Sequence, residues 1–588
     1  MNARRLLCLG ATLLAVVFAA PSVAQLLPPP DKLPPPPELP PPPPPPVLIE
    51  GKIDPGLLAL MNADRTALLP VIVEMQQPLA PFLGCQASSS PNVCRAVEAL
   101  NLLVVNGTPV APLSLINAAA GFANAAGIEA LSLVPDVAFV HHDRTVGPRQ
   151  TAAPAPPTPT EEFAPRYSRT VRAHPLWEVG IAGNGVAVAV LDSGVAADLD
   201  LIAPTNRILA SVNFADQAST SDPGGHGTHI AGIVAGNGTR SDGEFVGVAP
   251  QANIVDVRVL GRTGSGRMSS VVRGIEWVLA HRVEYNIRVI NLSLGAPAPL
   301  SYRIDPLSAA VEIAWRRGIV VVAASGNTGP ERDTVTSPGI DPYVITVGAT
   351  DSHGTRNAND DTLAWFSAWG NTESPKPDLV APGRRLASAH VPGSTLGTLY
   401  PDRVVSAPNG STYFRLSGTS QSTGVVSGAA ALLLQRHPHL TPDQVKAALV
   451  TGVQAYGWET GPVLPDPIAD GSGMVDAQDA AKAVTEGTSR PVNRGLRPSD
   501  AFARALYPVL YGTPLRWKDP LLGGILWHLL TWDTLVWDSV AWDNFDWDSV
   551  AWDSVAWDSV AWDSVAWDSV AWDSVAWDSV AWDTYTLD

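Results

Sequence analysis

Cysteine is scarce: the 588 residues include only Cys8, Cys85 and Cys94. Neither a histidine nor a further cysteine lies near the last two, so a metal site of the zinc type does not fit there. Cys8 falls in the N-terminal leader described below. In an exported protein, a disulfide between Cys85 and Cys94 across a short polar loop is expected, and two unpaired thiols are the alternative.

The N-terminus has no apolar run long enough for a membrane span. Leu6–Ala20 is apolar but short for a bilayer crossing, and Pro21 follows it. Two arginines before this run and the small residues Ser22–Ala24 after it are typical of a secretory signal peptide, which we assign to residues 1–24. A membrane anchor is the alternative. We therefore expect an extracytoplasmic protein, secreted or at the cell surface.

Positive charge is also in short supply. The formal net charge is −18, and residues 531–588 contain 13 aspartates but neither lysine nor arginine. The sequence has no basic stripe of the kind that binds nucleic acid, so we expect no nucleic-acid partner.

Proline, in contrast, is abundant and concentrated. Pro28–Pro46 holds 14 prolines in 19 residues, where no packed core can form. A stiff polyproline II spacer over residues 25–46 is expected, with a docking segment as the alternative. A second linker, residues 146–165, is rich in Pro, Thr and Ala and should be exposed and cleavable.

Between the two linkers, residues 47–145 have the pattern of a small α+β unit. One predicted helix carries Val93, Ala96, Val97 and Leu100 on one face. The Leu-Leu-Val-Val run at 102–105 predicts a strand that enters an Asn-Gly turn. The predicted elements are the strands Leu69–Met75, Leu102–Gly107 and Val137–Val140 and the helices Pro91–Leu100 and Ala126–Leu133.

The larger part, residues 166–485, alternates apolar strands with helices, which favours an α/β fold with a mainly parallel sheet covered by helices. The predicted strands are Val186–Leu191, Asn253–Val259, Val289–Leu292, Ile319–Ala323 and Tyr343–Val347. The predicted helices are His226–Ala235, Ser269–His281, Pro306–Arg317, Ser420–Arg436 and Pro442–Val450. Thr441, Pro442 and Gln444 form a capping-box pattern at the last helix.

Three motifs carry the chemistry. Ser420 heads the apolar run Val425–Leu434, where a helix start would favour developing negative charge. A serine cannot attack a carbonyl without a base and an orienting carboxylate. His226 lies in a Gly-His-Gly-Thr-His motif, and Asp192 ends an apolar run. Taken singly, each residue is more often a cap or a turn residue.

Taken together, in the order Asp, His, Ser, these motifs resemble those of the subtilisin-like serine peptidases, the subtilases, over about residues 177–483. Further matching segments are Gly247–Pro250, Val289–Gly295, Val320–Asn327 and Asp378–Gly383. The resemblance implies a three-layer subtilisin-like domain that hydrolyses polypeptides. Ser420 is then the nucleophile, His226 the general base, and Asp192 the residue that orients the histidine.

The resemblance also assigns supporting residues. Asn327 would donate to the oxyanion with the backbone N–H of Ser420; a plain turn asparagine is the alternative. The substrate groove would be lined by Ser293, Leu294, Gly295, Ala323, Ala324 and Ser325. Residues 47–145 resemble the ferredoxin-like propeptide domain that inhibits subtilases; an unrelated domain is the alternative.

The chain departs from the subtilase pattern at two places. After Ser420, where subtilases usually continue Met-Ala-Ser-Pro-His, Gly424 stands in place of proline, which should loosen the helix start. Gly383–Leu416 is long and implies an extra surface loop. The chemistry requires no cofactor. Structural calcium is common in the family, with Asp198, Asp200 and Asn237–Glu244 as candidates, and no metal ligand is assigned.

The tail, residues 531–588, repeats Trp-Asp every five residues eleven times between Trp532 and Trp582. The period differs from that of propeller repeats. A low-complexity interaction tail is the favoured interpretation, with a solenoid and aspartate ion binding as alternatives. We expect it to associate with a cell surface and to be dispensable for catalysis, so that truncation after about Val492 leaves the enzyme active.

The sequence therefore predicts a secreted serine endopeptidase, made as a self-processing zymogen with its own propeptide as inhibitor. Residues 486–530 are predicted to link the peptidase to the tail. The alternatives are a fold-retaining protein without catalysis, and a surface-displayed binding protein whose main function is the tail.

Overall fold

The computed structural model describes residues 51–76, 91–148, 167–215, 221–298, 301–353, 360–370, 375–457, 468–489, 492–493, 496 and 498–502. The predicted signal peptide, the Pro-rich linker, Cys85 and the repeat tail lie outside the described residues. Within the described part, no helix has the length and apolarity that a bilayer crossing requires.

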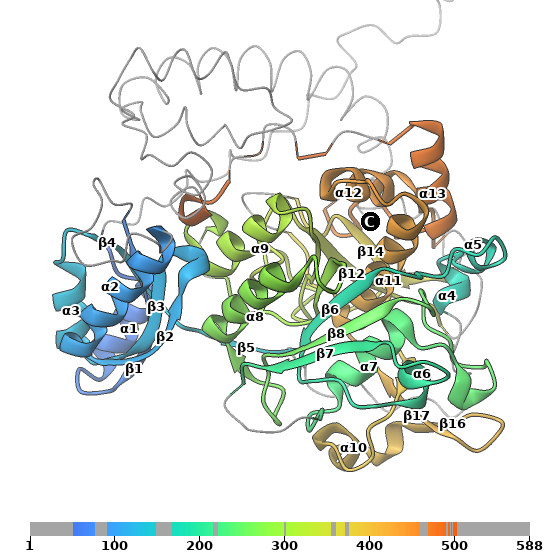
Figure 1. Cartoon of the computed structure of the whole chain (residues 1–588), viewed down its shortest axis with the longest axis horizontal. Coiled ribbons are helices and arrows are strands. Elements are labelled where there is room, and N and C mark those ends of the chain that lie inside the picture. Colours follow the sequence, from blue (N-terminus) through green and yellow to red (C-terminus); the bar gives the residue numbers. More distant parts are fainter. Residues whose placement is uncertain are drawn as a thin grey trace, which may run out of the picture. The chain divides into compact units, whose positions relative to one another are not determined.

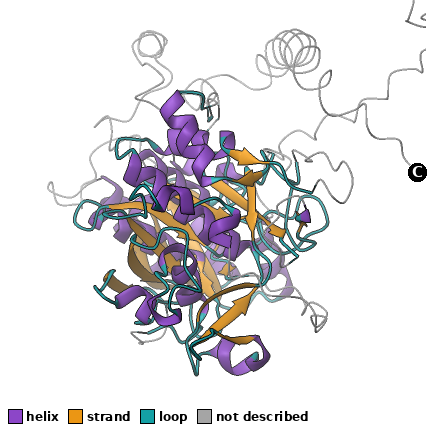
Figure 2. Ribbon diagram, turned by 90° about the vertical axis from the view of Figure 1, so that its right-hand side faces the viewer, coloured by secondary structure: helices purple, strands orange, loops and turns teal. Residues whose placement is uncertain are grey.

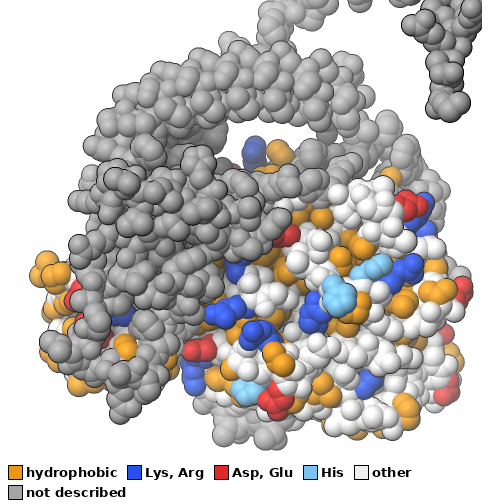
Figure 3. Space-filling view, turned by 45° about the horizontal axis from the view of Figure 1, so that its top comes forward, with side chains coloured by type: hydrophobic (Ala, Val, Ile, Leu, Met, Phe, Trp, Pro, Cys, Tyr) orange, Lys and Arg blue, Asp and Glu red, His pale blue; other side chains and the backbone are white. Residues whose placement is uncertain are grey.

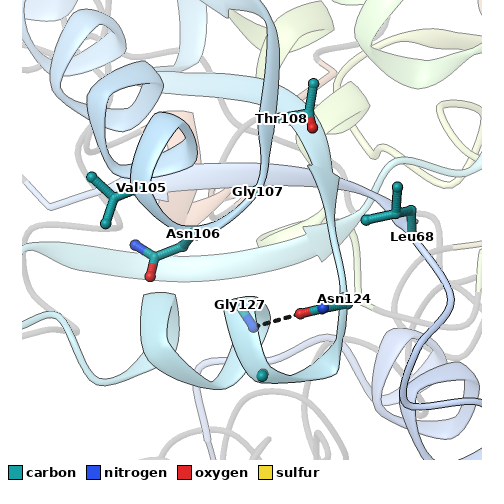
Figure 4. Close-up of a pocket in the computed structure, with 8 residues that line it drawn as sticks. Leu68, Val105, Asn106, Gly107, Thr108, Asn124 and Gly127 are labelled. Carbon is teal, nitrogen blue, oxygen red and sulfur yellow. Dashed lines mark hydrogen bonds between the residues drawn. The ribbon is translucent and has the colours of Figure 1, made fainter.

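The small N-terminal unit is a four-stranded antiparallel sheet in the order β2-β3-β1-β4. The chain order β1-α2-β2-β3-α3-β4 with this strand order is the ferredoxin-like arrangement. The elements are α1 (Pro55–Ala63), β1 (Leu69–Met75), α2 (Pro91–Asn106), β2 (Thr108–Leu113), β3 (Ala118–Ala123), α3 (Ala125–Ser132) and β4 (Val137–His142). The side chain of Asn124 caps α3 by accepting from Gly127 N at 3.0 Å, beside a surface pocket at the end of α2 (Figure 4).

The predicted strand Leu102–Gly107 is wrong, because α2 continues through it to Asn106. The predicted helix face is also wrong in part: Val93 and Val97 are 39% and 47% exposed. The face that packs on the sheet consists of Ala96, Ala99 and Leu103, which keep helical spacing across the predicted boundary. Burial of this face overrides the local strand preference of the Leu-Leu-Val-Val run.

Alternate residues of β1 enter two different cores. Val71, Val73 and Met75 pack with the helices of the small unit. Ile72 belongs instead to the core of the larger unit, residues 167–502, to which β2, β3 and the 3-10 helix η2 (Ser114–Ile116) also contribute. Since successive side chains of a strand point to opposite faces, the sheet of the small unit packs its second face on the larger unit.

The larger unit is built on a central sheet with the order β18-β19-β14-β12-β11-β10-β6-β8-β7. Its pairings from β14 to β7 are parallel, as predicted. The strands are β6 (Ala187–Asp192), β7 (Ile208–Asn213), β8 (Asn253–Arg258), β10 (Ile287–Leu292), β11 (Val320–Ala324), β12 (Ile345–Asp351), β14 (Leu379–Pro382), β18 (Val453–Gln454) and β19 (Met474–Val475), with β13 (Thr362–Leu363) paired to β12. All five predicted strands are present. The bounds of β6, β8 and β11 differ from the predicted ones by one residue, β10 begins two residues earlier, and β12 begins two residues later and runs four residues further.

The central sheet lies between two layers of helices (Figures 1 and 2). α7 (His226–Ala235) and α11 (Thr419–Arg436) pack against each other, and α8 (Met268–His281) packs against α9 (Pro306–Arg316). The remaining helices are α4 (Tyr167–Thr170), α5 (His174–Trp177), α6 (Leu199–Ile202), α10 (Thr395–Leu399), α12 (Pro442–Thr451) and α13 (Ala477–Glu486). The capping box at Thr441 is present as predicted.

Two regions contain more ordered structure than the sequence predicted. Gly383–Leu416 forms a small sheet, β15-β17-β16, from β15 (Leu386–Ala389), β16 (Val404–Ser406) and β17 (Thr412–Leu416). At the other end, Ala501 and Phe502 are buried in the large core. The packed body of the larger unit therefore reaches past the boundary predicted at residue 485.

Candidate active site

The predicted catalytic residues gather at one edge of the central sheet. The strand order reverses at β6, which has β8 on one side and β10 on the other. In open parallel sheets, ligands bind outside the carboxyl ends of the strands at such a point. Asp192 ends β6, Ser293–Gly295 follow β10, and Ser325–Asn327 follow β11.

Asp192 and His226 are directly bonded. The Nδ1 atom of His226 lies 2.8 Å from Oδ1 and 2.9 Å from Oδ2 of Asp192, and both side chains are buried. Burial lowers the pKa of His226, but the charges of Asp192 and Asp222 outweigh it and raise that pKa above its usual value. The imidazole is thus held with Nε2 as the atom that can exchange a proton with a nucleophile.

Asp222, which the sequence reasoning missed, holds the start of α7. Its carboxylate accepts hydrogen bonds from Gly225 N at 2.7 Å and from Thr228 N at 2.9 Å. It also accepts from the Ser193 hydroxyl at 2.7 Å, and that hydroxyl accepts from Gly227 N at 3.0 Å. This bridge joins the end of β6 to the first turn of α7. The signal available in the sequence was an acidic residue just ahead of a helix start.

Gly225 completes the entry to this helix. Its φ is +89°, and an added Cβ would lie 2.4 Å from the Ser394 hydroxyl oxygen. Both the backbone conformation and the space therefore call for glycine immediately before His226.

Helix packing places Ser420 and His226 at corresponding positions near the starts of two neighbouring helices. Gly424 of α11 lies against Ile230 and Ile233 of α7, and Gly428 lies against the backbone of Val234. The two helices therefore run in the same direction, with Gly424 opposite Ile230 and Gly428 opposite Val234. Ser420 lies four residues before Gly424, and His226 lies four residues before Ile230. A Cβ on Gly424 would come within 3.1 Å of Ile233, so glycine here permits close helix approach.

The Ser420 hydroxyl donates to the carbonyl oxygen of Ser293 at 3.0 Å, and Ser293 Oγ donates back to the Ser420 carbonyl at 2.9 Å. Catalytic hydrogen bonds in a substrate-free site often differ from those in the reacting complex. Ser293 is in turn bonded by Asn291, which accepts from Ser427. These buried bonds fix the nucleophile's helix against the end of β10.

Asn327 and Ser420 line one small cavity. The Oδ1 atom of Asn327 accepts from Thr419 N at 2.8 Å and from the Thr419 hydroxyl at 3.0 Å. The residue before Ser420 therefore fixes the oxygen end of this side-chain amide, and the other end of an amide is a hydrogen-bond donor.

A small cavity adjoins Ser420 and Asn327. It encloses about 10 Å³, room for about one water molecule. Of the predicted groove residues, Leu294, Gly295 and Ala324 line it. The others, Ser293, Ala323 and Ser325, are buried behind this wall. Thr336 also lines the cavity, a residue that no sequence motif marked; it lies so close to Gly295 that an added Cβ would be 2.3 Å from its hydroxyl oxygen.

The end of the small unit reaches the same cavity, which Gly147 and Pro148 help to line. Gly147 pairs with Gly295 through two backbone hydrogen bonds of 3.1 Å. Just before it, β5 (Thr145–Val146) pairs antiparallel with β9 (Gly266–Arg267) of the larger unit. The segment is thus added as a strand to the rim of the site, which is how an extended peptide binds.

Comparisons with known proteins agree with this geometry. The model of the subtilase family matches residues 183–480. The chain belongs to the subtilase family. It is 41% identical to "Serine protease AprX" of Bacillus subtilis over 309 residues, 51% of this chain and 67% of that protein. It is 36% identical to "Subtilisin Savinase" of Lederbergia lenta over 304 residues, 52% of this chain and 93% of that protein. This subtilase is a serine endopeptidase with a subtilisin-like α/β domain.

Two of the calcium candidates of this subtilase, Asp198 and Asp200, have hydrogen-bond partners within the chain. Arg240 pairs through its guanidinium with Asp198 and through its backbone N–H, at 2.6 Å, with Asp200. The Tyr413 hydroxyl also donates to Asp200, at 2.6 Å. Among the described residues, no three His, Cys, Asp or Glu side chains gather to hold a metal. The positive charge beside these two carboxylates is supplied by an arginine.

Charge on the visible surface is dispersed. On the face of Figure 3, Lys and Arg side chains are separated by uncharged ones and do not merge into one basic surface. Cys94, on α2, is disulfide-bonded. Its predicted partner Cys85 lies outside the described residues, so the pairing of these two cysteines stays a prediction.

Proposed function

We propose that this subtilase cleaves peptide bonds through an acyl-enzyme formed on Ser420. His226 accepts the serine proton and returns it to the leaving amine, and Asp192 fixes the imidazole and stabilises its charged form. The bond between both oxygens of Asp192 and Nδ1 of His226 is the observation that carries this proposal. Asn327 donates through Nδ2 to the oxyanion, together with the backbone N–H of Ser420.

The enzyme is made as a zymogen whose small N-terminal unit acts as an intramolecular inhibitor. Three observations support this: the second face of its sheet is buried on the peptidase, β5 pairs with β9, and Gly147 pairs with Gly295. Because this segment lies where an extended substrate would bind, substrate cannot enter until the chain is cut and the segment leaves. Extended polypeptides then bind in the same way, through Leu294, Gly295 and Ala324 on the cavity wall.

The mature enzyme works outside the cytoplasm. The leader at residues 1–24 and the disulfide-bonded Cys94 support this location, since disulfides persist in oxidising compartments. The Trp-Asp repeats associate the enzyme with a cell surface. The chemistry uses side chains and backbone only, and structural calcium, with Asp198, Asp200 and Asn237–Glu244 as candidate ligands, stays a proposal.

A fluorophosphonate probe tests the nucleophile directly, because it labels a serine only where a base activates it. Mass spectrometry of the enzyme expressed as the full chain should find the label on Ser420. Ser420→Ala should take up no label. Ser422→Ala is the matched control: Ser422 sits two residues on, is fully buried and donates to the Ala381 carbonyl at 2.9 Å, and its loss should leave labelling intact. Label on another serine, with Ser420 unmodified, would overturn the assignment.

A further inference from the structure

The segment that enters the active site carries a charged side chain into the peptidase. Arg144, three residues before Gly147, donates from Nη2 to Asp305 Oδ1 at 2.6 Å. Both side chains are almost fully buried, with exposed fractions of 6% and 1%. A buried guanidinium that lost this carboxylate would have no compensation for its desolvation, so the contact is selective for the arginine.

The receptor half of this pair is fixed by the peptidase itself. Asp305 caps α9: its Oδ2 atom accepts from Ser308 N at 2.9 Å and from the Ser337 hydroxyl at 2.6 Å. Those bonds do not involve the small unit, so Oδ1 stays aimed at the same place when the segment leaves. A carboxylate held in this way is a preorganised acceptor for a cation.

The backbone register is fixed as well. Met268 N donates to the Arg144 carbonyl at 3.1 Å, Thr145 pairs with Arg267, and Gly147 pairs with Gly295. Any extended peptide that pairs with Gly295 in this register brings its residue three positions earlier to Asp305. The contact with Asp305 does not depend on the small cavity, because Arg144 precedes the cavity residues Gly147 and Pro148 along the chain.

We propose that Asp305 forms an arginine subsite of this endopeptidase, which favours polypeptides with arginine three residues before the residue that pairs with Gly295. The proposal rests on the proposed function, because it takes the bound segment as a guide to how substrate binds. The guanidinium of Arg144 makes a second contact, in which Nε donates to Met268 Sδ at 3.4 Å. Lysine should bind less well, because its single ammonium group cannot make both contacts with the geometry of a planar guanidinium.

The test uses enzyme purified after expression of the full chain and a quenched fluorescent peptide with the sequence of residues 142–152. A second peptide carries citrulline, the uncharged isostere of arginine, in place of Arg144. The arginine peptide should have a kcat/KM about 10- to 100-fold higher, the range for a hydrogen bond to a charged group. Mass spectrometry of the products checks that the same bond is cut in both.

Asp305→Asn should bring the ratio of the two kcat/KM values close to one, because asparagine can still cap α9 but carries no charge. Asp476→Asn is the control: Asp476 caps α13, accepting from Asp479 N at 2.9 Å, and pairs with Arg172 at 2.7 Å. Asp476→Asn should keep the wild-type ratio.

If wild-type enzyme cuts both peptides equally well, the subsite is refuted and the proposed peptidase function stands. If it cuts neither peptide nor a general protein substrate, both are refuted. The wild-type ratio decides the matter even if Asp305→Asn fails to fold.

Discussion

Gly147 and Gly295 face each other across two backbone hydrogen bonds of 3.1 Å, one in each direction. A residue of the N-terminal unit therefore occupies a strand position beside the nucleophile. Pro148 follows at the cavity that Ser420 and Asn327 line. In an extended chain each further residue advances about 3.3 Å, so the bond presented to Ser420 lies shortly after Pro148.

This relationship predicts where the zymogen is cut. The wild-type chain should be cleaved within residues 149–166, between Pro148 and Tyr167, and Ser420→Ala should accumulate uncut. Intact-mass spectrometry and N-terminal sequencing of both proteins from a peptidase-free host decide this. Ser422→Ala should mature like wild type. Identical processing of the Ser420→Ala protein in this host would mean that Ser420 does not make the cut.

The role of Asn327 gives a second prediction. Asn327→Ala should lower kcat by about 10²- to 10³-fold with little change in KM, a magnitude taken from subtilisin, a relative of this chain. The reason is that the amide bonds to charge that develops only in the transition state. Steady-state kinetics with a soluble peptide measure both constants. Thr336→Ser, which alters the cavity wall but keeps its hydroxyl, is a useful comparison; a purely KM effect of Asn327→Ala would assign it to ground-state binding instead.

Most of the fold follows from local patterns in the sequence. Continuous apolar runs marked the buried parallel strands, and Thr441 with Gln444 marked a helix start that the structure contains. The Leu102–Gly107 strand failed because local residue preference is weaker than the burial of Ala99 and Leu103. Local pattern could not show which side of α2 would meet the sheet.

The predicted catalytic residues sit in sequence motifs, whereas the residues that support them do not. Arg144 and Asp305 lie 161 positions apart, and Ser193 and Asp222 lie 29 apart. Such contacts are created by strand order and helix packing, which no short window of sequence contains. The same holds for the ion pair between Arg240 and Asp198.

The pH dependence of hydrolysis follows from His226. The base must be neutral, and the charges of Asp192 and Asp222 raise its pKa above 6.5 in spite of burial. Activity should therefore fall as the pH drops through this raised pKa, with the midpoint of kcat/KM above about 6.5. Asp222→Asn removes one raising contribution and should move the midpoint to lower pH. Asp476→Asn should leave the midpoint in place. If the midpoint of kcat/KM does not move in Asp222→Asn, Asp222 stabilises only the start of α7 and does not influence the pKa of His226.

The capping box offers a stability test. Gln444 N donates to Thr441 Oγ1 at 3.3 Å, and Thr441 N donates to Gln444 Oε1 at 2.9 Å. Thr441→Ala should lower the free energy of unfolding by about 1 kcal/mol, because a backbone donor at the helix start loses its partner. Thr441→Ser keeps the hydroxyl and should cost much less. Both substitutions are made in the Ser420→Ala protein, which should not digest itself, and urea denaturation gives the free energy of unfolding of each. If Ser420→Ala and its Thr441→Ala and Thr441→Ser derivatives are equally stable, the capping box contributes nothing to stability.

The C-terminal limit of the peptidase yields the last prediction, and it reverses the expectation that the chain can be cut after Val492. The Glu312 carboxylate accepts from Ser499 N at 2.9 Å and from the Ser499 hydroxyl at 2.8 Å. Burial and the nearby Asp341 raise the pKa of Glu312 well above its usual value. Phe502, beyond this contact, is 2% exposed in the large core.

Truncation after Val492 should therefore destabilise the enzyme by at least the cost of emptying one buried phenylalanine site, about 3–5 kcal/mol. Truncation after Arg504 removes the Trp-Asp repeats but keeps Ser499 and Phe502, and it should retain the melting temperature and the hydrolysis of a small soluble peptide. Phe502→Ala in the full chain separates the effect of this side chain from that of chain length. If protein ending at Val492 melts with the full chain, the segment does not stabilise the peptidase. If protein ending at Arg504 is inactive, the repeats support catalysis, and their assignment as a separate surface-associating tail is wrong.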